Sequence, residues 1–112
     1  MSEFAKAWRA EQLQVDAKYD GAEATIIVEG ELDIHSVERF LACVSEALEA
    51  HPGSISVDAR GVTFMDSSGL AAVLHARSMS GHAGVPFRIS DPSPQVRRAV
   101  EVAGVEELLT DR

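Results

Sequence analysis

The sequence predicts a single α/β domain: a four-stranded mixed sheet with three helices packed mainly on one face. Its length of 112 residues matches one domain with a core of its own. Short β-branched runs alternate with segments whose apolar residues recur at helical spacing, in the order β-β-α-β-α-β-α. Each strand–helix–strand crossover returns on the same hand and gives parallel neighbours, so only the first two strands are expected to be antiparallel.

The first two strands are predicted to form a β-hairpin. Leu13, Val15 and Ala17 alternate with polar neighbours, and a turn at Asp20-Gly21 separates them from a β-branched run at residues 24–28. Alternation of this kind is typical of a half-buried strand.

The residues before this hairpin form a separate N-terminal arm in our assignment. Residues 1–11 mix Phe4 and Trp8 with charged and small residues, which suits either a frayed arm or a short helical turn covering one sheet edge. We therefore divide the chain into an arm at residues 1–11 and the folded domain at residues 12–112.

The first helix is predicted from a stripe of apolar residues that runs as far as His51-Pro52-Gly53. The only cysteine, Cys43, lies in this stretch, so we expect a buried and unreactive thiol. The residues of the stripe are Ile34, Val37, Leu41, Val44 and Leu48.

The third strand and the second helix follow without a linker. Residues 55–59 read as a strand whose end is loosened by Arg60-Gly61 before residues 62–65. Ser67 or Ser68 is then expected to cap the second helix, which should stop by Gly81 or Gly84. The buried face of this helix is assigned to Leu70, Val73, Leu74 and Ala76, and the core is expected to contain Val57, Val73 and Leu74.

The last strand and helix are predicted from strong local signals. Residues 85–90 form the strand, and Pro86 indicates an edge position or the first residue of the strand. Ser93-Pro94 is a serine cap followed by proline at the first helical position, and Gly104 ends the helix. Residues 105–109 could add one more turn. The apolar stripe of this helix is Val96, Val100 and Ala103.

Composition and charge exclude several classes of function. Ten Lys and Arg against eighteen Asp and Glu give a net charge of −8, which would repel a nucleic-acid backbone. There is neither an apolar run of about eighteen residues nor a secretory signal, so we expect no membrane partner and a cytoplasmic location. The four histidines are scattered and Cys43 has no partner at ligand spacing, so neither a metal nor another cofactor is expected.

The segment from Met65 to Leu70 carries the chemistry. Two hydroxyls, of Ser67 and Ser68, and the carboxylate of Asp66 fall together at the start of a helix. Backbone N–H groups there have no intrahelical partner, and the helix dipole favours negative charge. A phosphate on Ser68 would find donors there while adding about −1.5 to −2 charges to the surface.

The serines are open to two other interpretations. Taken alone, Ser67 and Ser68 are better explained as helix caps, because serine is a common N-cap residue. A serine hydrolase is not supported, because the Gly-x-Ser-x-Gly motif needs a glycine two residues before the nucleophile and the chain has Met65 or Asp66 there. We therefore assign no catalytic residue and expect no enzyme.

The segment Met65-Asp66-Ser67-Ser68-Gly69-Leu70, preceded by Gly30-Glu31-Leu32-Asp33 and followed by Ser93-Pro94-Gln95-Val96, resembles the STAS domain of sulphate transporters and anti-sigma factor antagonists. The resemblance spans roughly Leu13 to Leu109. It implies a partner-switching role, in which the dephosphorylated antagonist binds an anti-sigma factor and frees a sigma factor. The anti-sigma factor, acting as a serine kinase, inactivates the antagonist, and a serine phosphatase restores it.

The resemblance also assigns site residues. The phosphoacceptor is the hydroxyl residue before the glycine, Ser68, with Ser67 as the less favoured acceptor. The partner-binding residues are Asp33, Asp66, Ser67, Ser68, Gly69 and Leu70. Since the second strand ends and the second helix starts on one rim of the sheet, Asp33 should lie close to Ser68.

Two departures and two alternatives accompany this assignment. The arm is longer than a minimal family member needs, and Ala71-Ala72 stands where the family often has a glycine after the leucine. A STAS scaffold of a stress-signalling complex, or a structural STAS subunit of a lipid or anion transporter, is the alternative function. The chain is expected to be a monomer or a weak dimer.

Overall fold

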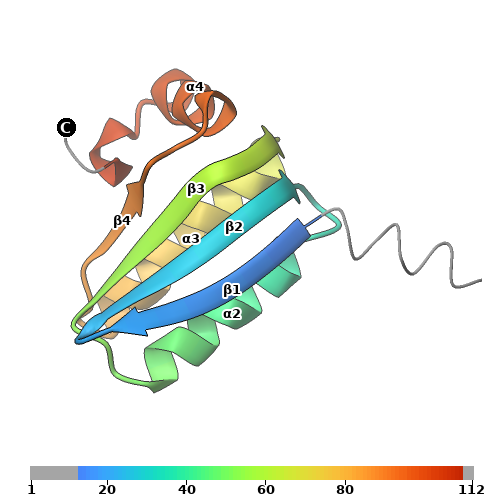
Figure 1. Ribbon diagram of the computed structural model, residues 1–112. Helices are drawn as coiled ribbons and strands as arrows, with labels where there is room; N and C mark the ends of the chain where they lie inside the picture. The colour runs from blue at the N-terminus through green and yellow to red at the C-terminus, as the bar shows by residue number, and fades with distance from the viewer. Residues whose placement is uncertain (1–12, 110–112) are drawn as a thin grey trace, which may run out of the picture.

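The computed structural model of the chain describes residues 13–109, which form one sheet and the helices that pack on it. The predicted order β-β-α-β-α-β-α is confirmed, and a short 3₁₀ turn follows the last helix. The elements, labelled as in Figure 1, are β1 (Leu13–Asp20), β2 (Glu23–Leu32), α2 (Val37–Glu49), β3 (Ser54–Met65), α3 (Ser67–His82), β4 (Phe87–Ser90), α4 (Pro94–Ala103) and η1 (Glu106–Leu108).

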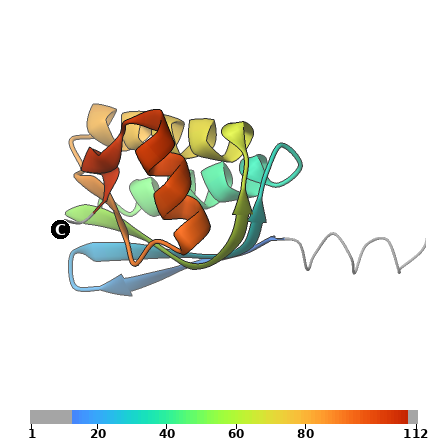
Figure 2. The ribbon, with the colours of Figure 1, turned by 90° about the horizontal axis from the view of Figure 1, so that it is seen from above.

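The sheet is mixed, as predicted. Its strand order is β1-β2-β3-β4, with β1 antiparallel to β2 and the other neighbours parallel. The helices lie on one side of the strands, with α2 and α3 along the sheet and α4 beside its β3–β4 side (Figure 2). No helix of the described residues covers the other face of the sheet, and the β1 side chains on that face, such as Lys18, are exposed.

The hydrophobic core lies between the sheet and the helices. Alternate residues of β2, including Ile26 and Val28, are buried because a strand directs every second side chain to the same face. Phe40 and Val44 of α2 meet them from the helix layer. Val57 and Val73 are buried as predicted.

The third strand is one continuous element, so the predicted loosening at Arg60-Gly61 is wrong. Instead, β3 changes register against β2 at two points, between Ile27 and Glu29 and again after Gly30. Extra residues on one strand of a pair bend that strand and increase its twist. Gly61 suits this place because a Cβ atom there would come within 2.7 Å of Cγ of Glu29.

The start of the first helix differs from the prediction. α2 begins at Val37, and Ile34 lies in the preceding loop with 63% of its surface exposed. The buried residues of α2 are Phe40, Val44 and Ala47, so its core face is rotated from the predicted stripe. Cys43 is only half-buried.

The buried face of α3 is also rotated from the prediction. Leu70 and Leu74 are half-buried and pack against the core from its margin. The positions closest to the sheet carry small side chains, since a helix can then approach the strands closely. The buried residues of α3 are Gly69, Ala72, Val73, Ala76 and Ser80.

The last strand and helix follow the local signals closely. β4 is an edge strand, as Pro86 predicted, although it begins at Phe87 and is shorter than residues 85–90. The Ser93 hydroxyl accepts a hydrogen bond from the Val96 N–H (3.2 Å) and caps α4. At the other end of α4, Gly104 adopts φ +74°, the left-handed conformation that favours glycine, while Ala103, predicted in the apolar stripe, is exposed.

Candidate functional site

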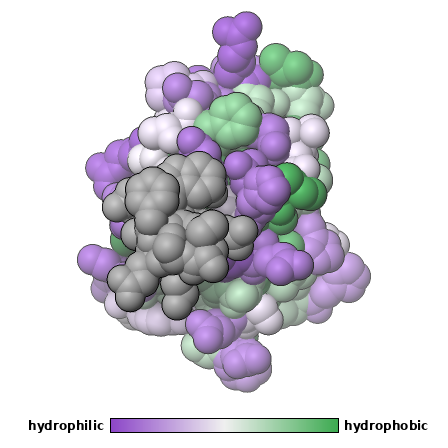
Figure 3. All heavy atoms as spheres, turned by 90° about the vertical axis from the view of Figure 1, so that its right-hand side faces the viewer, coloured by the Kyte–Doolittle hydropathy of each residue, from purple (hydrophilic) through white to green (hydrophobic). Residues whose placement is uncertain are grey.

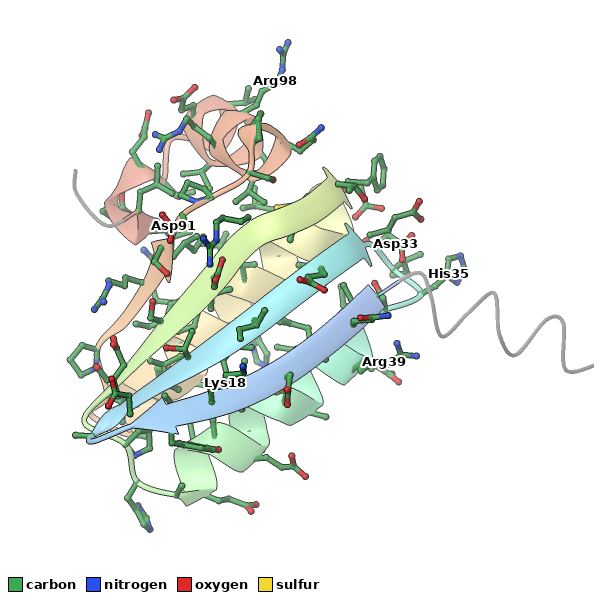
Figure 4. The ribbon with its side chains drawn as sticks, in the orientation of Figure 1. Lys18, Asp33, His35, Arg39, Asp91 and Arg98 are labelled. Atoms are coloured by element: carbon green, nitrogen blue, oxygen red, sulfur yellow. The ribbon has the colours of Figure 1, made fainter. Side chains whose placement is uncertain are left out.

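The predicted site lies at the carboxyl ends of the two central strands. β2 and β3 run parallel, and Leu32 at the end of β2 is paired with Met65 at the end of β3. Asp33 and Asp66 each lie one residue beyond this pair, so the two carboxylates belong to adjacent segments on one edge. We call this edge, formed by residues 31–36 and 64–70, the rim; Asp33 and His35 mark it in Figure 4.

Asp33 is held in a tight turn. Its carboxylate accepts a hydrogen bond from the His35 N–H (3.0 Å), and its carbonyl accepts from the N–H groups of Ser36 and Val37 (both 3.0 Å). The buried Ser36 hydroxyl donates to the Glu31 carbonyl (2.7 Å) and accepts from the Asp33 N–H (3.0 Å). These bonds fix the loop and carry the chain from β2 into α2.

Asp66, and not a serine, caps α3. Its carboxylate accepts a hydrogen bond from the Gly69 N–H (2.9 Å), and its backbone is extended, as at an N-cap. The prediction that Ser67 or Ser68 is the cap is therefore wrong. An aspartate competes well for this position because its negative charge interacts favourably with the helix dipole.

Because Asp66 caps α3, neither serine hydroxyl is needed as the helix cap. Ser67 and Ser68 are the first two residues of α3, Ser67 exposed and Ser68 partly buried. Neither hydroxyl has a hydrogen-bond partner within residues 13–109. By contrast, the hydroxyls of Ser36, Ser56 and Ser93 are each engaged in holding the fold.

Gly69 brings the start of α3 against the end of β2. A Cβ atom at this position would overlap the carbonyl oxygen of Leu32 and approach Cγ of Met65 at 3.1 Å. Ser68 and Asp33 are the chain neighbours of Gly69 and Leu32, so this contact places both on the rim, as predicted. No hydrogen bond joins their side chains within the described part of the chain.

Two exposed apolar side chains also lie on the rim, and the sequence prediction missed them both. Ile34 follows Asp33 and is 63% exposed; Phe64, paired with Glu31 in the sheet, is 47% exposed. Ile34 had been assigned to the buried face of a helix, yet its place between Asp33 and Ser36, two turn-forming residues, was the signal against that assignment. Figure 3 shows this side of the molecule, where apolar patches lie among hydrophilic side chains.

The part of the chain that the structure describes brings neither a metal-ligand cluster nor a histidine base to the serines. Within residues 13–109, no three His, Cys, Asp or Glu side chains are grouped to hold a metal ion. All four histidines are exposed, and the one with a hydrogen bond, His82, bonds its ring Nδ1 to the Ser78 carbonyl of its own helix (2.8 Å). None of them contacts the hydroxyl of Ser67 or Ser68 through a hydrogen bond, which a serine nucleophile would need.

Comparison with known proteins agrees with this geometry. The family described as "Mlab, STAS domain" matches residues 12–110. The chain belongs to the STAS domain family. It is 30% identical over 89 residues to a STAS-domain containing protein of Pseudomonas aeruginosa (strain UCBPP-PA14), covering 80% of this chain and 87% of that protein. It is 34% identical over 84 residues to the anti-sigma F factor antagonist of Lysinibacillus sphaericus, covering 73% of this chain and 71% of that one.

Solved STAS structures have the same fold. The anti-sigma factor antagonist SpoIIAA in its unphosphorylated form is 28% identical, with a TM-score of 0.73, over 89% of this chain and 87% of that chain. The Bacillus SpoIIAA structure in the phosphorylated form is 27% identical, with a TM-score of 0.68, over 89% and 90% of the two chains. The STAS fold therefore extends over nearly all the described residues.

None of the described helices is long and apolar enough to cross a membrane.

Proposed function

We propose that this STAS protein is an anti-sigma factor antagonist whose rim binds an anti-sigma factor while Ser68 is unmodified, which frees a sigma factor. Phosphorylation of Ser68 by the anti-sigma factor, acting as a serine kinase, switches binding off, and a serine phosphatase restores it. The protein acts in the cytoplasm and performs no catalysis of its own.

The free hydroxyl of Ser68 is the observation that carries this proposal. Because Asp66 caps α3, modification of Ser68 removes no hydrogen bond on which the helix depends. The position can therefore change its charge while the fold is kept. A serine that served as the cap, like Ser93 at the start of α4, would lose its bond to the backbone on modification.

The start of α3 suits a phosphate for electrostatic reasons. N–H groups in the first turn of a helix lack intrahelical partners, and the dipole favours an anion there. Yet the phosphate would add about −1.5 to −2 charges beside Asp33 and Asp66. A partner surface that accepts a neutral hydroxyl would then meet added bulk, negative charge and a desolvation penalty.

The rim has the composition of a protein-binding surface. Ile34 and Phe64 supply exposed apolar area, while Asp33 and Glu31 surround it with charge. Binding energy at protein interfaces comes mainly from a few well-packed, desolvated side chains, and the charged surroundings direct association and orientation. The relatives named anti-sigma factor antagonists, among them SpoIIAA in phosphorylated and unphosphorylated forms, support the same function.

Mass spectrometry of the protein after incubation with candidate anti-sigma kinases and ATP tests the proposal. One phosphate is expected on the wild type and on Ser67→Ala, and none on Ser68→Ala. Circular dichroism should show that all three proteins are folded. Phosphate found only on Ser67 would show that Ser67 is the acceptor. If no candidate kinase placed a phosphate on either serine, the proposed switch would be contradicted.

A second candidate is a structural STAS subunit or scaffold of a larger assembly, such as a lipid or anion transporter. The family that matches the chain is described as "Mlab, STAS domain", a description that does not itself specify an anti-sigma factor antagonist. A structural subunit would bind its partner equally well with or without charge at Ser68. Partner affinity of the Ser68 variants therefore separates the two functions.

A further inference from the structure

Among the described residues, the outer edge of β1 pairs with no other strand. β1 is an end strand of the sheet, eight residues long and without proline. The Ala17 N–H donates to its neighbour's carboxylate, Oδ1 of Asp16 (2.9 Å), and the Leu13 carbonyl accepts from the guanidinium of Arg39. Ala17 and Leu13 thus direct their backbone N–H and C=O groups away from β2. In an antiparallel pair every second residue does so, and therefore Val15 and Tyr19 also direct these groups outward.

The side chains along this edge are accessible on both faces. Asp16 and Lys18 lie at the strand positions that alternate toward the open face and are exposed, and Asp16 at the edge also borders the groove between β1 and α2. On the helix side, Val15, Ala17 and Tyr19 line a groove between β1 and α2, and Tyr19 is 55% exposed. A long exposed edge with a groove of mixed apolar and charged lining beside it is a template for another strand.

We propose that β1 pairs with β1 of a second copy of this chain, antiparallel, with Ala17 opposite Ala17 on a two-fold axis. In this register every cross-strand pair is complementary. Asp16 of each copy faces Lys18 of the other on the open face, and Val15 of each copy faces Tyr19 of the other on the groove side. The two sheets then form one continuous sheet of eight strands.

The residues of α2 beside the groove support the same axis. Arg39, Ala42, Cys43 and Glu46 line the groove at spacings that place them on one face of the helix. Because Arg39 bonds the first residue of β1, the helix runs along the strand in the same direction. A two-fold axis at Ala17 therefore sets Arg39 of one copy toward Glu46 of the other, with the smaller Ala42 and Cys43 between them.

Charge determines the register of this pairing more than its strength. A lysine on an edge strand normally discourages pairing, and exposed ion pairs contribute little to affinity. Here Lys18 forms an ion pair with Asp16 of the other copy. The Asp16 carboxylate then gives up its hydrogen bond from the Ala17 N–H of its own chain, and this N–H becomes available to pair with the other β1. A weak, reversible dimer follows, and the rim, at the ends of β2 and β3, stays accessible in it.

Sedimentation equilibrium of the full chain over a range of concentrations tests the proposal. The wild type should show a reversible monomer–dimer equilibrium. Lys18→Glu places like charges opposite each other and should weaken the dimer at least tenfold, whereas Asp16→Lys combined with Lys18→Glu restores the opposite-charge pairs and the dimer. Arg98→Glu, on exposed α4 away from β1 (Figure 4), makes the same change in net charge and should dimerise like the wild type.

Disulfide trapping provides an independent measurement of the register. Directly opposed residues in a hydrogen-bonded antiparallel pair have Cα atoms about 5.5 Å apart, within disulfide range. In a Cys43→Ser background, Ala17→Cys should therefore form covalent dimers under mild oxidation, and Tyr19→Cys should not. A wild type that stays monomeric, as it would if its own N-terminal segment covered the edge, overturns the proposal. So does a Lys18→Glu variant that dimerises like the wild type, or equal trapping at both cysteine positions.

Discussion

The backbone of Gly69 lies directly against the carbonyl oxygen of Leu32, with no room between them for a side chain. This contact joins the first turn of α3 to the end of β2. It holds the segment that carries Ser68 beside the turn that carries Asp33. The position of Ser68 is therefore fixed by the glycine that follows it.

Gly69→Ala is predicted to destabilise the protein. The added Cβ atom would overlap backbone, which cannot yield without moving the helix, and overpacking of this kind costs about 1–3 kcal/mol. Gly81→Ala, in the same helix but with open space around the position, should instead be neutral or stabilise the protein by up to about 1 kcal/mol. Urea unfolding of both variants measures the difference, and equal effects would show that the contact does not constrain the fold.

Truncation of two leucines tests where the core ends. Leu108 is fully buried, so Leu108→Ala should cost about 2–5 kcal/mol. Leu74→Ala should cost less, because the half-buried side chain loses less contact and leaves a space open to water. A larger loss at Leu74 than at Leu108 in thermal or urea unfolding would contradict the placement of α3.

Local sequence signals predicted the fold well wherever backbone chemistry determines it. Asp20-Gly21 marked the hairpin turn, and Ser93-Pro94 and Gly104 marked the two ends of α4. These residues act through their own backbone geometry and capping bonds. Their effect therefore does not depend on what packs against them.

The errors concern which face of a helix is buried. Leu74 and Ile34 have apolar side chains at helical spacing, and the sequence pattern assigned them to the core. In the structure the close approach of α3 to the sheet selects small residues such as Ala72 and Ala76 for the most buried positions. That selection depends on the distance between layers, which one helix's sequence does not contain.

The ion pair between Asp58 and Arg60 predicts a pH-dependent contribution to stability. The hydrogen bonds from the Arg60 guanidinium (3.2 and 2.9 Å) hold the pKa of Asp58 below its ordinary value. A carboxylate with a lowered folded-state pKa contributes stability above its unfolded pKa of about 3.9, and this contribution disappears as the pH falls through the folded-state pKa. Its size is small because Arg60 is exposed.

Arg60→Ala should therefore unfold at a lower urea concentration than the wild type at pH 6, and the two midpoints should converge as the pH falls below about 4. Arg98→Ala, which removes an exposed cation that has no paired carboxylate among the described residues, serves as the control. If the difference in urea midpoint between the wild type and Arg60→Ala increased on acidification, the assigned ion pair between Asp58 and Arg60 would be contradicted.

The apolar pair on the rim is predicted to contribute to partner binding. Ile34→Ser and Phe64→Ser should each weaken binding of an anti-sigma factor at least tenfold, about 1.4 kcal/mol, while leaving the unfolding midpoint nearly unchanged because both side chains are exposed. Val102→Ser is the matched control, since Val102 is 81% exposed but lies on α4. If the Val102 variant lost as much affinity in surface plasmon resonance as the other two, the rim would not be the interface.

The candidate site could be predicted in part. The Met65–Leu70 motif identified the serines and Asp66, and the parallel order of β2 and β3 placed Asp33 on the same edge. The motif could not tell which residue caps α3, because aspartate and serine are similarly favoured there. Nor could it reveal the exposure of Phe64, which depends on the register shift of β3 against β2.

Binding of an anti-sigma factor to Ser68→Asp, measured by titration calorimetry, tests the phospho-switch most directly. The variant should fold as stably as the wild type, since negative charge in the first turn of a helix is tolerated or mildly favourable. It should bind at least tenfold more weakly, whereas Ser78→Asp, which adds the same charge to an exposed position ten residues further along α3, should bind like the wild type. Wild-type affinity of Ser68→Asp for an anti-sigma factor that binds the unmodified protein would contradict the account.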